Sequence, residues 1–202
     1  MKKLLPLLLL SVALLGSFIV RPAGYQVGDT AVDFKLRNVD GRQVALTDYP
    51  AAKGFIVVFT CNTCPYAKAY EQRIIALNQQ YAPQGYPVVA INANDPSASP
   101  GDSYPAMQQL AKAHAYRFPY LQDETQQVAR TYGATRTPHL YVLQRQGQAL
   151  KVAYVGAIDD NSEDAKLAKT HYLQNALNQL LAGQPVTQPT TQAIGCAIKW
   201  KK

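Results

Sequence analysis

Two residues separate Cys61 from Cys64, within the stretch Thr60–Pro65. At this spacing two sulfurs can meet across one helical turn, so a disulfide can form and break without moving the backbone. In such a pair the first cysteine is normally the exposed attacker, and the second is buried and releases the mixed disulfide. Half of a zinc site is the alternative, but a full structural site needs four ligands, and the only other cysteine is the distant Cys196. The spacing therefore favours a redox dithiol in which Cys61 attacks and Cys64 resolves.

The neighbouring residues place this pair at the start of a helix. Five bulky apolar residues without alternation, Phe55–Phe59, are typical of a strand buried on both faces. After the cysteines the spacing becomes helical, with one face formed by Ala67, Tyr70, Ile74, Leu77 and Tyr81. We expect Asn62 or Thr63 to cap this helix and Pro65 to lie in its first turn. Unpaired N–H groups and the helix dipole favour an anion at that end, so the pKa of a thiol there should fall.

The rest of the pattern predicts an α/β domain. The alternating residues 32–36, the turn at Asp40-Gly41 and the segment Val44–Leu46 predict an N-terminal β-hairpin. Further along we expect a buried strand at 87–92, a polar loop at 93–104, a helix around 107–114, a second hairpin at 140–155 and a last helix at 173–181. This order, hairpin, βαβ unit, helix, hairpin and helix, is typical of an α/β fold. A tail rich in Thr, Gln and Pro follows at residues 185–202.

The first residues resemble an export signal. Lys2 and Lys3 precede Leu4–Val20, a run without any charge, and the cleavage site after it is poorly defined. We therefore expect residues 1–23 to be a signal peptide or an uncleaved membrane anchor, followed by a domain at 24–184 and the tail. Either outcome puts the body in the periplasm or elsewhere outside the cytoplasm, where dithiols can cycle through disulfides.

The charge of the chain argues against a nucleic-acid partner. The formal net charge is +7, from 20 basic and 13 acidic residues. A basic balance can indicate nucleic acid or anionic membrane when it is clustered. Here the basic residues are scattered, and the longest run outside the first residues is Lys201-Lys202. We expect a soluble basic surface, a protein dithiol or disulfide partner or an electron donor, and membrane contact only through residues 1–23.

Thr137-Pro138, just before the second hairpin, extends the pattern. A strand, C-x-x-C, a helix, a strand and a helix, followed by Thr-Pro, a hairpin and a closing helix, resemble the thioredoxin superfamily over about residues 26–183. The resemblance implies a thioredoxin-like fold, a central mixed sheet flanked by helices, with an N-terminal β-hairpin extension and a C-terminal tail. It implies that Pro138 is cis and packs against the dithiol and that the backbone of Thr137 holds a substrate peptide. We expect no cofactor and no metal.

A narrower resemblance concerns the peroxiredoxin (AhpC/TSA) and TlpA/ResA branch. The segment 28–36 is similar to the N-terminal hairpin of that branch, and Gly195–Trp200 matches the Gly-Cys-x-Ile-Lys-Trp tail of exported peroxiredoxin-like proteins with C-x-x-C. In peroxiredoxins the reactive cysteine lies in P-x-x-x-T-x-x-C; aligned on Cys64, that motif meets Val57 at the Pro and Cys61 at the Thr. Arg136 is the nearest candidate for the Arg that would hold the thiolate. These departures favour dithiol exchange over antioxidant peroxide reduction.

Three accessory residues complete the candidate site. Cys196 is either a third redox thiol that resolves or relays electrons, or a structural thiol in the tail. Glu71, on the same helix face as Cys64, is either a proton relay or, more simply, a solvated acid. His139 is a proton donor, a metal ligand with the sulfurs, or a solvent-facing strand residue.

Three functions follow from these residues. The first is an extracytoplasmic thiol–disulfide oxidoreductase using Cys61 and Cys64. The second is a peroxiredoxin-like thiol peroxidase with Cys64 as the peroxidatic residue. The third is a copper chaperone using Cys61, Cys64 and His139, which the spacing disfavours because related copper carriers use C-x-x-x-C.

Overall fold

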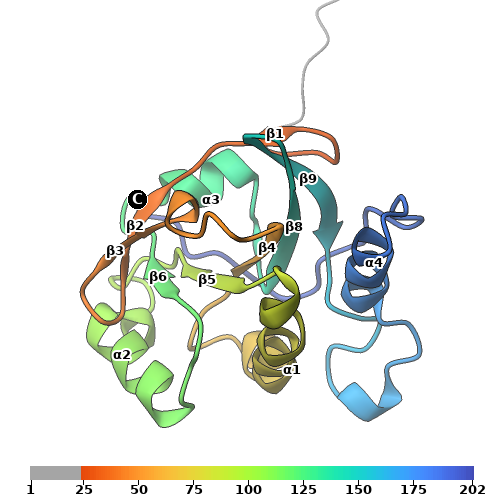
Figure 1. Cartoon of the computed structure of the whole chain (residues 1–202). Coiled ribbons are helices and arrows are strands. Elements are labelled where there is room, and N and C mark those ends of the chain that lie inside the picture. Colours follow the sequence, from red (N-terminus) through yellow and green to blue (C-terminus); the bar gives the residue numbers. More distant parts are fainter. Residues whose placement is uncertain (1–23) are drawn as a thin grey trace, which may run out of the picture.

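A computed structural model describes residues 24–202, and the predicted signal or anchor at 1–23 lies outside this part. An eight-stranded mixed sheet forms its centre, in the order β1-β9-β8-β4-β5-β6-β2-β3 (Figure 1). Its strands are β1 (Thr30–Ala31), β2 (Lys35–Asn38), β3 (Gln43–Ala45), β4 (Gly54–Phe59), β5 (Val88–Asn92), β6 (Tyr120–Gln122), β8 (His139–Gln146) and β9 (Ala149–Gly156). Strands β4, β5 and β6 run parallel, and every other pairing in this sheet is antiparallel.

Helices cover both faces of the sheet. They are α1 (Pro65–Tyr81), α2 (Tyr104–Ala113), α3 (Gln127–Tyr132) and α4 (Tyr172–Leu181), with short 3-10 turns at Leu46–Asp48, Ala82–Gln84, Pro100–Asp102 and Ala165–Leu167. Helices α1 and α4 lie together on one side, and α3 lies on the other (Figure 1). Within residues 24–202 no helix is both long enough and apolar enough to cross a membrane.

Strand β4 joins two hydrophobic cores because its side chains alternate between the faces. Ile56 and Val58 pack with α1 and α4 in one core. Phe55, Val57 and Phe59 pack with α3 and the N-terminal hairpin in the other. All five side chains have no exposed surface. The prediction of a strand buried on both sides is therefore confirmed, and the strand ends immediately before the cysteines.

The predicted helix face and hairpins are also present. Ala67, Tyr70, Ile74, Leu77 and Tyr81 are all buried on α1. β2 pairs with β3 and β8 with β9, as the two predicted hairpins require. The predicted cap is wrong: Cys64 is the N-cap residue of α1, and no side chain caps it. The side chain of Asn62 instead donates to the carbonyl of Gly101 and accepts from the hydroxyl of Tyr120, and the hydroxyl of Thr63 donates to the buried carboxylate of Asp102.

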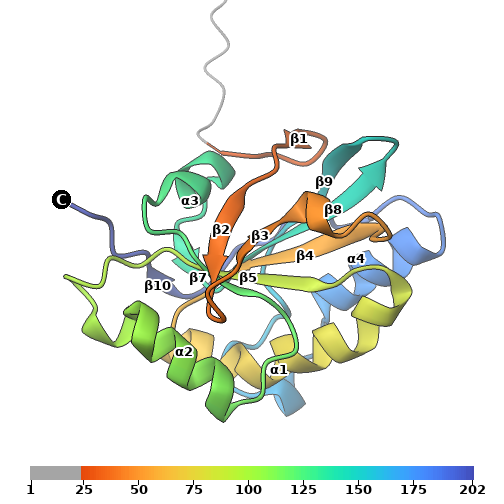
Figure 2. The same ribbon diagram turned by 60° about the vertical axis from the view of Figure 1, so that its left-hand side comes forward.

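The C-terminal tail folds back onto the sheet edge where β4 ends. Its strand β10 (Cys196–Ala197) pairs antiparallel with β7 (Arg136–Thr137), and these two strands form a separate small sheet. Figure 2 shows β10 beside β7, below α3. The tail thus brings Cys196 to the start of α1.

Candidate functional site

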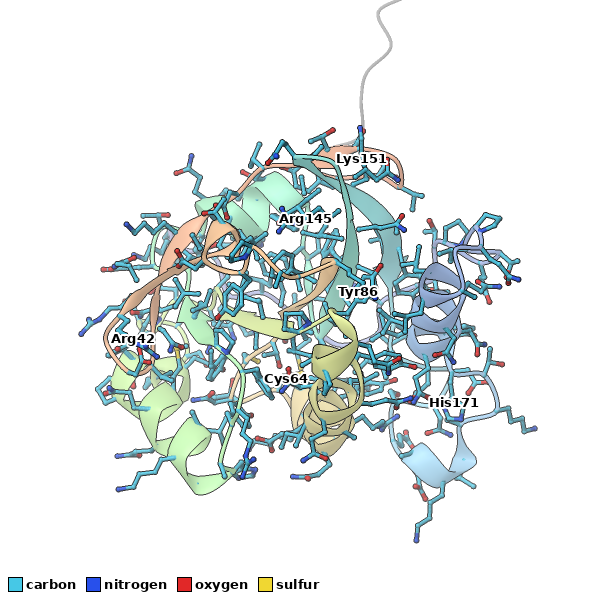
Figure 3. The ribbon with its side chains drawn as sticks, in the orientation of Figure 1. Arg42, Cys64, Tyr86, Arg145, Lys151 and His171 are labelled. Carbon is cyan, nitrogen blue, oxygen red and sulfur yellow. The ribbon has the colours of Figure 1, made fainter. Side chains whose placement is uncertain are left out.

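Cys61 and Cys64 lie between the end of β4 and the start of α1. Figure 3 labels Cys64. Pro65 occupies the first helical turn, as predicted, and the N–H of Lys68 donates to the carbonyl of Cys64 at 3.0 Å. The expected contrast between an exposed first cysteine and a buried second one is wrong, because Cys61 is 5% exposed and Cys64 is 3% exposed. Both sulfurs are shielded by the segment around Thr137 and by the tail.

Thr137 touches both cysteines of the pair. Its hydroxyl lies 3.3 Å from the sulfur of Cys61, and its carbonyl oxygen lies 3.1 Å from the sulfur of Cys64. The peptide bond to Pro138 is cis, as the resemblance implied. Thr137, which was predicted from sequence as part of the substrate groove, therefore stands directly against the two thiols.

The third cysteine belongs to the same cluster. Cys196 lies opposite Thr137 in the β10–β7 pairing. Its sulfur is 2.6 Å from that of Cys64, and its backbone N–H donates to the Cys64 sulfur at 3.4 Å. Cys196 also packs against the small buried cluster of Cys61, Cys64 and Ala67. Three thiols are thus gathered at one helix N-terminus, and Cys196 is the most exposed of them.

The surroundings push the pKa values of the three thiols in different directions. Burial alone would raise the pKa of Cys64, but hydrogen bonds from the Cys196 thiol and from the N–H groups of Ala67 and Cys196 outweigh it and lower the pKa. Burial raises the pKa of Cys61, and the nearby charge of Asp102 adds to this rise. Burial and the contact with Cys64 raise the pKa of Cys196 to about 11. Of the three thiols, Cys64 is therefore the one whose surroundings favour the thiolate, and it is the helix N-cap, where N–H groups favour an anion.

A buried carboxylate fixes the loop between the two cysteines. Asp102 is 1% exposed. Its oxygens accept five hydrogen bonds, from the N–H of Asn62 (2.6 Å), Thr63 Oγ1 (2.7 Å), Asn92 Nδ2 (3.1 Å), Asn94 Nδ2 (2.9 Å) and Ser99 Oγ (2.6 Å). None of these donors is a cation. Burial would raise the pKa of Asp102, but the donors outweigh this effect and keep the pKa below its ordinary 3.8.

Sequence reasoning placed Asp102 only in a polar loop and gave it no role. A usable signal was present. The loop follows β5, which is the parallel neighbour of β4, and parallel strands bring their carboxyl ends to one edge of a sheet. The polar residues after β5 therefore had to lie near the cysteines after β4.

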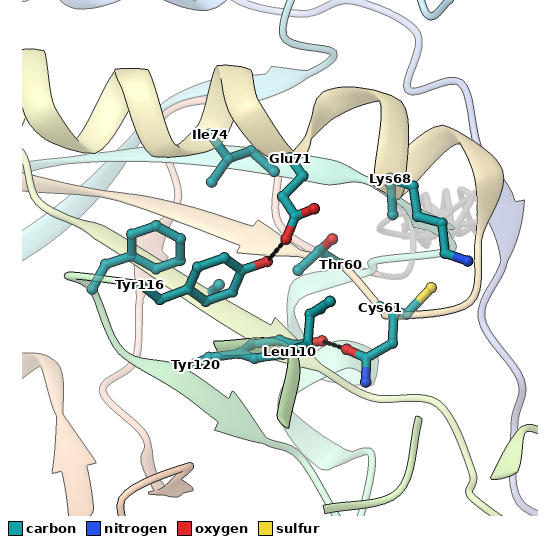
Figure 4. A pocket seen from close by; sticks show the side chains of 12 residues that line it. Thr60, Cys61, Lys68, Glu71, Ile74, Leu110, Tyr116 and Tyr120 are labelled. Atoms are coloured by element: carbon teal, nitrogen blue, oxygen red, sulfur yellow. Dashed lines mark hydrogen bonds between the residues drawn. The ribbon is translucent and has the colours of Figure 1, made fainter. Parts of the chain in front are cut away.

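Cys61 also borders a small cavity of about 20 Å³, which is room for roughly one water molecule. Figure 4 shows Glu71 and Tyr116 on one side of it and Tyr120 below. Glu71 accepts from the hydroxyl of Tyr116 and lies 3.0 Å from Nδ1 of His114. Its side chain is 13% exposed, so the simpler prediction of a solvated acid is wrong. Glu71 is instead bound by Tyr116 and by His114, the C-cap residue of α2.

Comparison with known proteins agrees with this geometry. The AhpC/TSA family matches residues 27–155. The chain belongs to the AhpC/TSA family. A relative named thiol-disulfide oxidoreductase ResA, from Geobacillus thermodenitrificans, is 28% identical over 154 residues, which cover 72% of this chain and 82% of the relative. The prediction of an oxidoreductase of this class, within the thioredoxin superfamily, is thereby confirmed.

Two solved structures resemble this AhpC/TSA chain. An uncharacterized conserved protein from Geobacillus kaustophilus is 38% identical with a TM-score of 0.81, covering 91% of this chain and 98% of its own. A putative thiol:disulfide interchange protein DsbE from Chlorobium tepidum is 21% identical with a TM-score of 0.58, covering 77% and 98%. The second likeness concerns the fold alone, and the thioredoxin-like fold predicted from sequence is confirmed.

The two remaining candidates of this AhpC/TSA chain, Arg136 and His139, flank Thr137-Pro138 in the sequence. Arg136 donates to the carbonyl of Gly195 at 3.3 Å, so its guanidinium holds the tail. The ring of His139 packs against that of Tyr141 in a tilted orientation, Nδ1 of His139 accepts weakly from the N–H of Thr135, and burial lowers the pKa of His139 to about 4. Across residues 24–202 no three His, Cys, Asp or Glu side chains are placed to hold a metal ion. His139 therefore does not complete a copper site with the cysteines.

Proposed function

We propose that this chain is an extracytoplasmic thiol–disulfide oxidoreductase that exchanges disulfides with a protein partner through Cys61 and Cys64. The observation that carries the proposal is the gathering of both sulfurs against Thr137 at the N-terminus of α1, with the pKa of Cys64 lowered. A thiolate is the nucleophile of disulfide exchange, and a neighbouring thiol is needed to release the mixed disulfide.

The pKa directions support an order of attack that reverses the one expected from sequence. The Cys64 thiolate attacks a partner disulfide, forms a mixed disulfide and releases the first partner sulfur as a thiolate. Cys61, once deprotonated, then attacks the Cys64 sulfur and releases the second partner sulfur. The Cys61–Cys64 disulfide forms, and the partner leaves as a dithiol that has gained two electrons.

Thr137 and Pro138 form the seat for the partner segment in this proposal. Thr137 already offers its backbone to a strand, since it pairs with Cys196 of β10. A partner disulfide that is to reach Cys64 must therefore displace β10. The pairing involves only two residues, and such a short contact can open at low cost.

A location outside the cytoplasm is part of the proposal and rests on residues 1–20, where two lysines precede an uncharged apolar run. A fusion of residues 1–30 to a reporter enzyme that is active only outside the cytoplasm tests it. Activity equal to that of an established export signal supports the proposed location. An inactive but stable reporter would remove it.

Trapping the mixed disulfide tests the chemistry and the order of attack together. Because Cys196 lies close enough to resolve a mixed disulfide, both trapping variants also carry Cys196→Ser. We expect Cys61→Ser to retain a partner or an insulin chain on Cys64, and Cys64→Ser to retain at least tenfold less. The opposite result would restore Cys61 as the attacker. No adduct in either variant, with no insulin reduction by the unmodified chain, would contradict the proposed function.

A second candidate function, peroxide reduction at Cys64, is favoured by one observation. The thiol with the lowered pKa has a potential resolving thiol, Cys196, only 2.6 Å away. Against it, Cys61 stands where the peroxidase motif places the Thr hydroxyl. Rapid loss of free thiols with micromolar hydrogen peroxide would support this function, and reaction only at millimolar peroxide would remove it.

A further inference from the structure

We propose that Cys196 is a third redox thiol, which takes over the disulfide from Cys61 to form a Cys64–Cys196 disulfide and so becomes the sulfur at which an outside thiol delivers electrons. The inference rests on the proposed function, because it names the route by which the Cys61–Cys64 disulfide is reduced again. Geometry carries it: the Cys64 and Cys196 sulfurs are 2.6 Å apart, about 0.6 Å more than a disulfide bond.

The tail is shaped to hold Cys196 in this place. Gly195 lies so close to β7 that a Cβ added to it would stand 2.2 Å from the carbonyl oxygen of Thr137. Only a residue without a side chain permits this approach, and it directly precedes Cys196. Beyond the cysteine, Ile198 is 3% exposed and its N–H donates to the carbonyl of Thr135 at 3.2 Å. The tail is thus held on both sides of its thiol.

The same polar network also joins the tail to the loop between Cys61 and Cys64. Asn94 donates to Asp102 at 2.9 Å and accepts from the N–H of Lys199 at 2.9 Å. Asp102 in turn binds the N–H of Asn62. Asp102 therefore positions the loop directly and the tail only through Asn94, and this arrangement gives the exchange a high effective concentration.

The internal step is a balanced thiol–disulfide exchange. The Cys196 thiolate attacks the Cys64 sulfur of the Cys61–Cys64 disulfide. The Cys64–Cys196 bond forms, the Cys61–Cys64 bond breaks, and the electron pair leaves on Cys61, which takes up the proton that Cys196 lost. No outside oxidant is needed, and the number of disulfides stays the same.

The next step brings in electrons from a thiol donor. An outside thiolate attacks Cys196, which is the more exposed end of the new disulfide, and expels the Cys64 thiolate. Expulsion of Cys64 is favoured because its pKa is lowered and a thiol of lower pKa leaves faster. A second outside thiolate then releases Cys196, so that two donor thiols become one disulfide and the three cysteines are free again.

Disulfide mapping of the full chain tests the pairing. The reduced chain is oxidised with one equivalent of diamide, quenched in acid, alkylated and digested for mass spectrometry. We expect the unmodified chain to contain both Cys61–Cys64 and Cys64–Cys196, and the Cys61→Ser variant to form Cys64–Cys196 within the monomer. A Cys61→Ser monomer that keeps both thiols free would overturn the proposal. So would a Cys64→Ser variant that joins Cys61 to Cys196 equally fast.

A variant at Gly195 tests whether the close contact of the tail with β7 is needed for the Cys64–Cys196 disulfide. Gly195→Ala should push β10 off β7 and lower the ratio of Cys64–Cys196 to Cys61–Cys64 at least tenfold, while Cys61–Cys64 still forms. Ile194→Ala is the matched control, since Ile194 is the neighbouring residue and is 47% exposed. An unchanged ratio of the two disulfides in Gly195→Ala would show that the contact of the tail with β7 does not cause the Cys64–Cys196 disulfide to form.

The electron route is measured separately from the function. Oxidised chain is mixed with reduced glutathione, and we expect Cys196→Ser to be reduced at least tenfold more slowly than the unmodified chain. Equal rates would remove Cys196 from the route while leaving Cys61–Cys64 exchange intact. Conversely, a chain that forms Cys64–Cys196 but never reduces insulin would contradict the proposed function and leave the cysteine pairing standing.

Discussion

Two segments meet at the sulfur of Cys64, and they are held in different ways. The loop before it, Asn62-Thr63, is fixed from beneath by Asp102, which is almost completely buried and fully hydrogen-bonded. The tail on its other side is held by the two-residue pairing of β10 with β7, by the buried Ile198 and by scattered hydrogen bonds. Cys196 and Ala197 themselves remain partly exposed.

This difference distinguishes the loop Asn62-Thr63, which must stay in place, from β10, which can move away from Cys64. Moving the loop would leave several buried donors without an acceptor, and each would cost about 1–3 kcal/mol. Moving β10 breaks a short strand pairing whose groups water can satisfy. A partner can therefore reach Cys64 by displacing the tail, while the loop keeps Cys61 and Cys64 together.

Removing the carboxylate that holds the loop Asn62-Thr63 should have the largest effect on stability and activity. Asp102→Asn puts an amide NH₂ among groups that all donate, so at least one buried donor loses its acceptor. We expect the free energy of unfolding to fall by about 3 kcal/mol and the rate of insulin reduction to fall at least tenfold. Asp102 acts here as a positioning residue, so formation of the Cys61–Cys64 disulfide should slow in the same proportion.

A second buried aspartate provides the matched control. Asp159 is 3% exposed, but it pairs with the guanidinium of Arg73 at 2.7 Å, far along α1 from the cysteines. Asp159→Asn leaves a largely buried cation unpaired and should destabilise the chain by about 3–5 kcal/mol. Its disulfide formation should nevertheless keep the unmodified rate under conditions where it is folded. Equal slowing in both variants would mean that Asp102 acts only through stability.

Removing the Cys196 thiol from the tail should change the pH dependence of the alkylation rate of Cys64. In a Cys61→Ser background, the rate of alkylation by iodoacetamide follows the thiolate fraction of Cys64. That thiolate is present above the pKa of Cys64 and is lost as the pH falls through it, so a lowered pKa puts the midpoint below the ordinary 9.0. Adding Cys196→Ala removes the hydrogen bond from the Cys196 thiol, and the midpoint should move to higher pH.

The control for this shift keeps a donor at the same place. Cys196→Ser retains a hydroxyl, so its midpoint should lie between those of the parent and of Cys196→Ala. A midpoint that does not move in Cys196→Ala would show that the helix N-terminus alone sets the pKa of Cys64. In that case the tail would cover the thiolate without stabilising it.

Sequence patterns gave the local half of this site well. The run Phe55–Phe59, the buried face of α1 and the C-x-x-C spacing depend on residues close together in the chain, and periodicity exposes them. Thr137-Pro138 could be added only through the resemblance to a family, because the contact with the cysteines spans more than seventy positions. The parts of the site that are close together in the chain could therefore be predicted from local patterns, and the contact with Thr137 could not.

The contacts between distant parts of the chain had no periodic signal in the sequence. Cys196 lies 132 positions from Cys64, and no local pattern fixes where a tail rich in Thr, Gln and Pro will fold. The wrong cap has the same origin. Asn62 and Thr63 have the right residue types for capping, but in the folded chain Asn62 Oδ1 accepts from the hydroxyl of Tyr120 and the hydroxyl of Thr63 donates to Asp102. Local propensity favours a cap on α1, whereas in the folded chain both side chains bind residues that are distant in the sequence.

The smallest effect is expected from Arg136, and it separates two roles for this residue. The peroxiredoxin resemblance implies an Arg that holds the thiolate, whereas the structure puts the Arg136 guanidinium on the carbonyl of Gly195. Arg136→Gln should therefore loosen β10 slightly and raise the alkylation rate of Cys64 about two- to threefold, since an exposed hydrogen bond contributes about 0.5 kcal/mol. The midpoint of the pH curve should not move.

The midpoint decides between the two roles because each one acts on a different quantity. A tail contact changes how often Cys64 is uncovered, which scales the rate equally at every pH. A cation beside the sulfur changes the free-energy gap between thiol and thiolate, which moves the curve along the pH axis. A rise of the midpoint in Arg136→Gln, at an unchanged plateau rate, would thus return Arg136 to the sulfur and weaken the contrast between a fixed loop and a releasable tail.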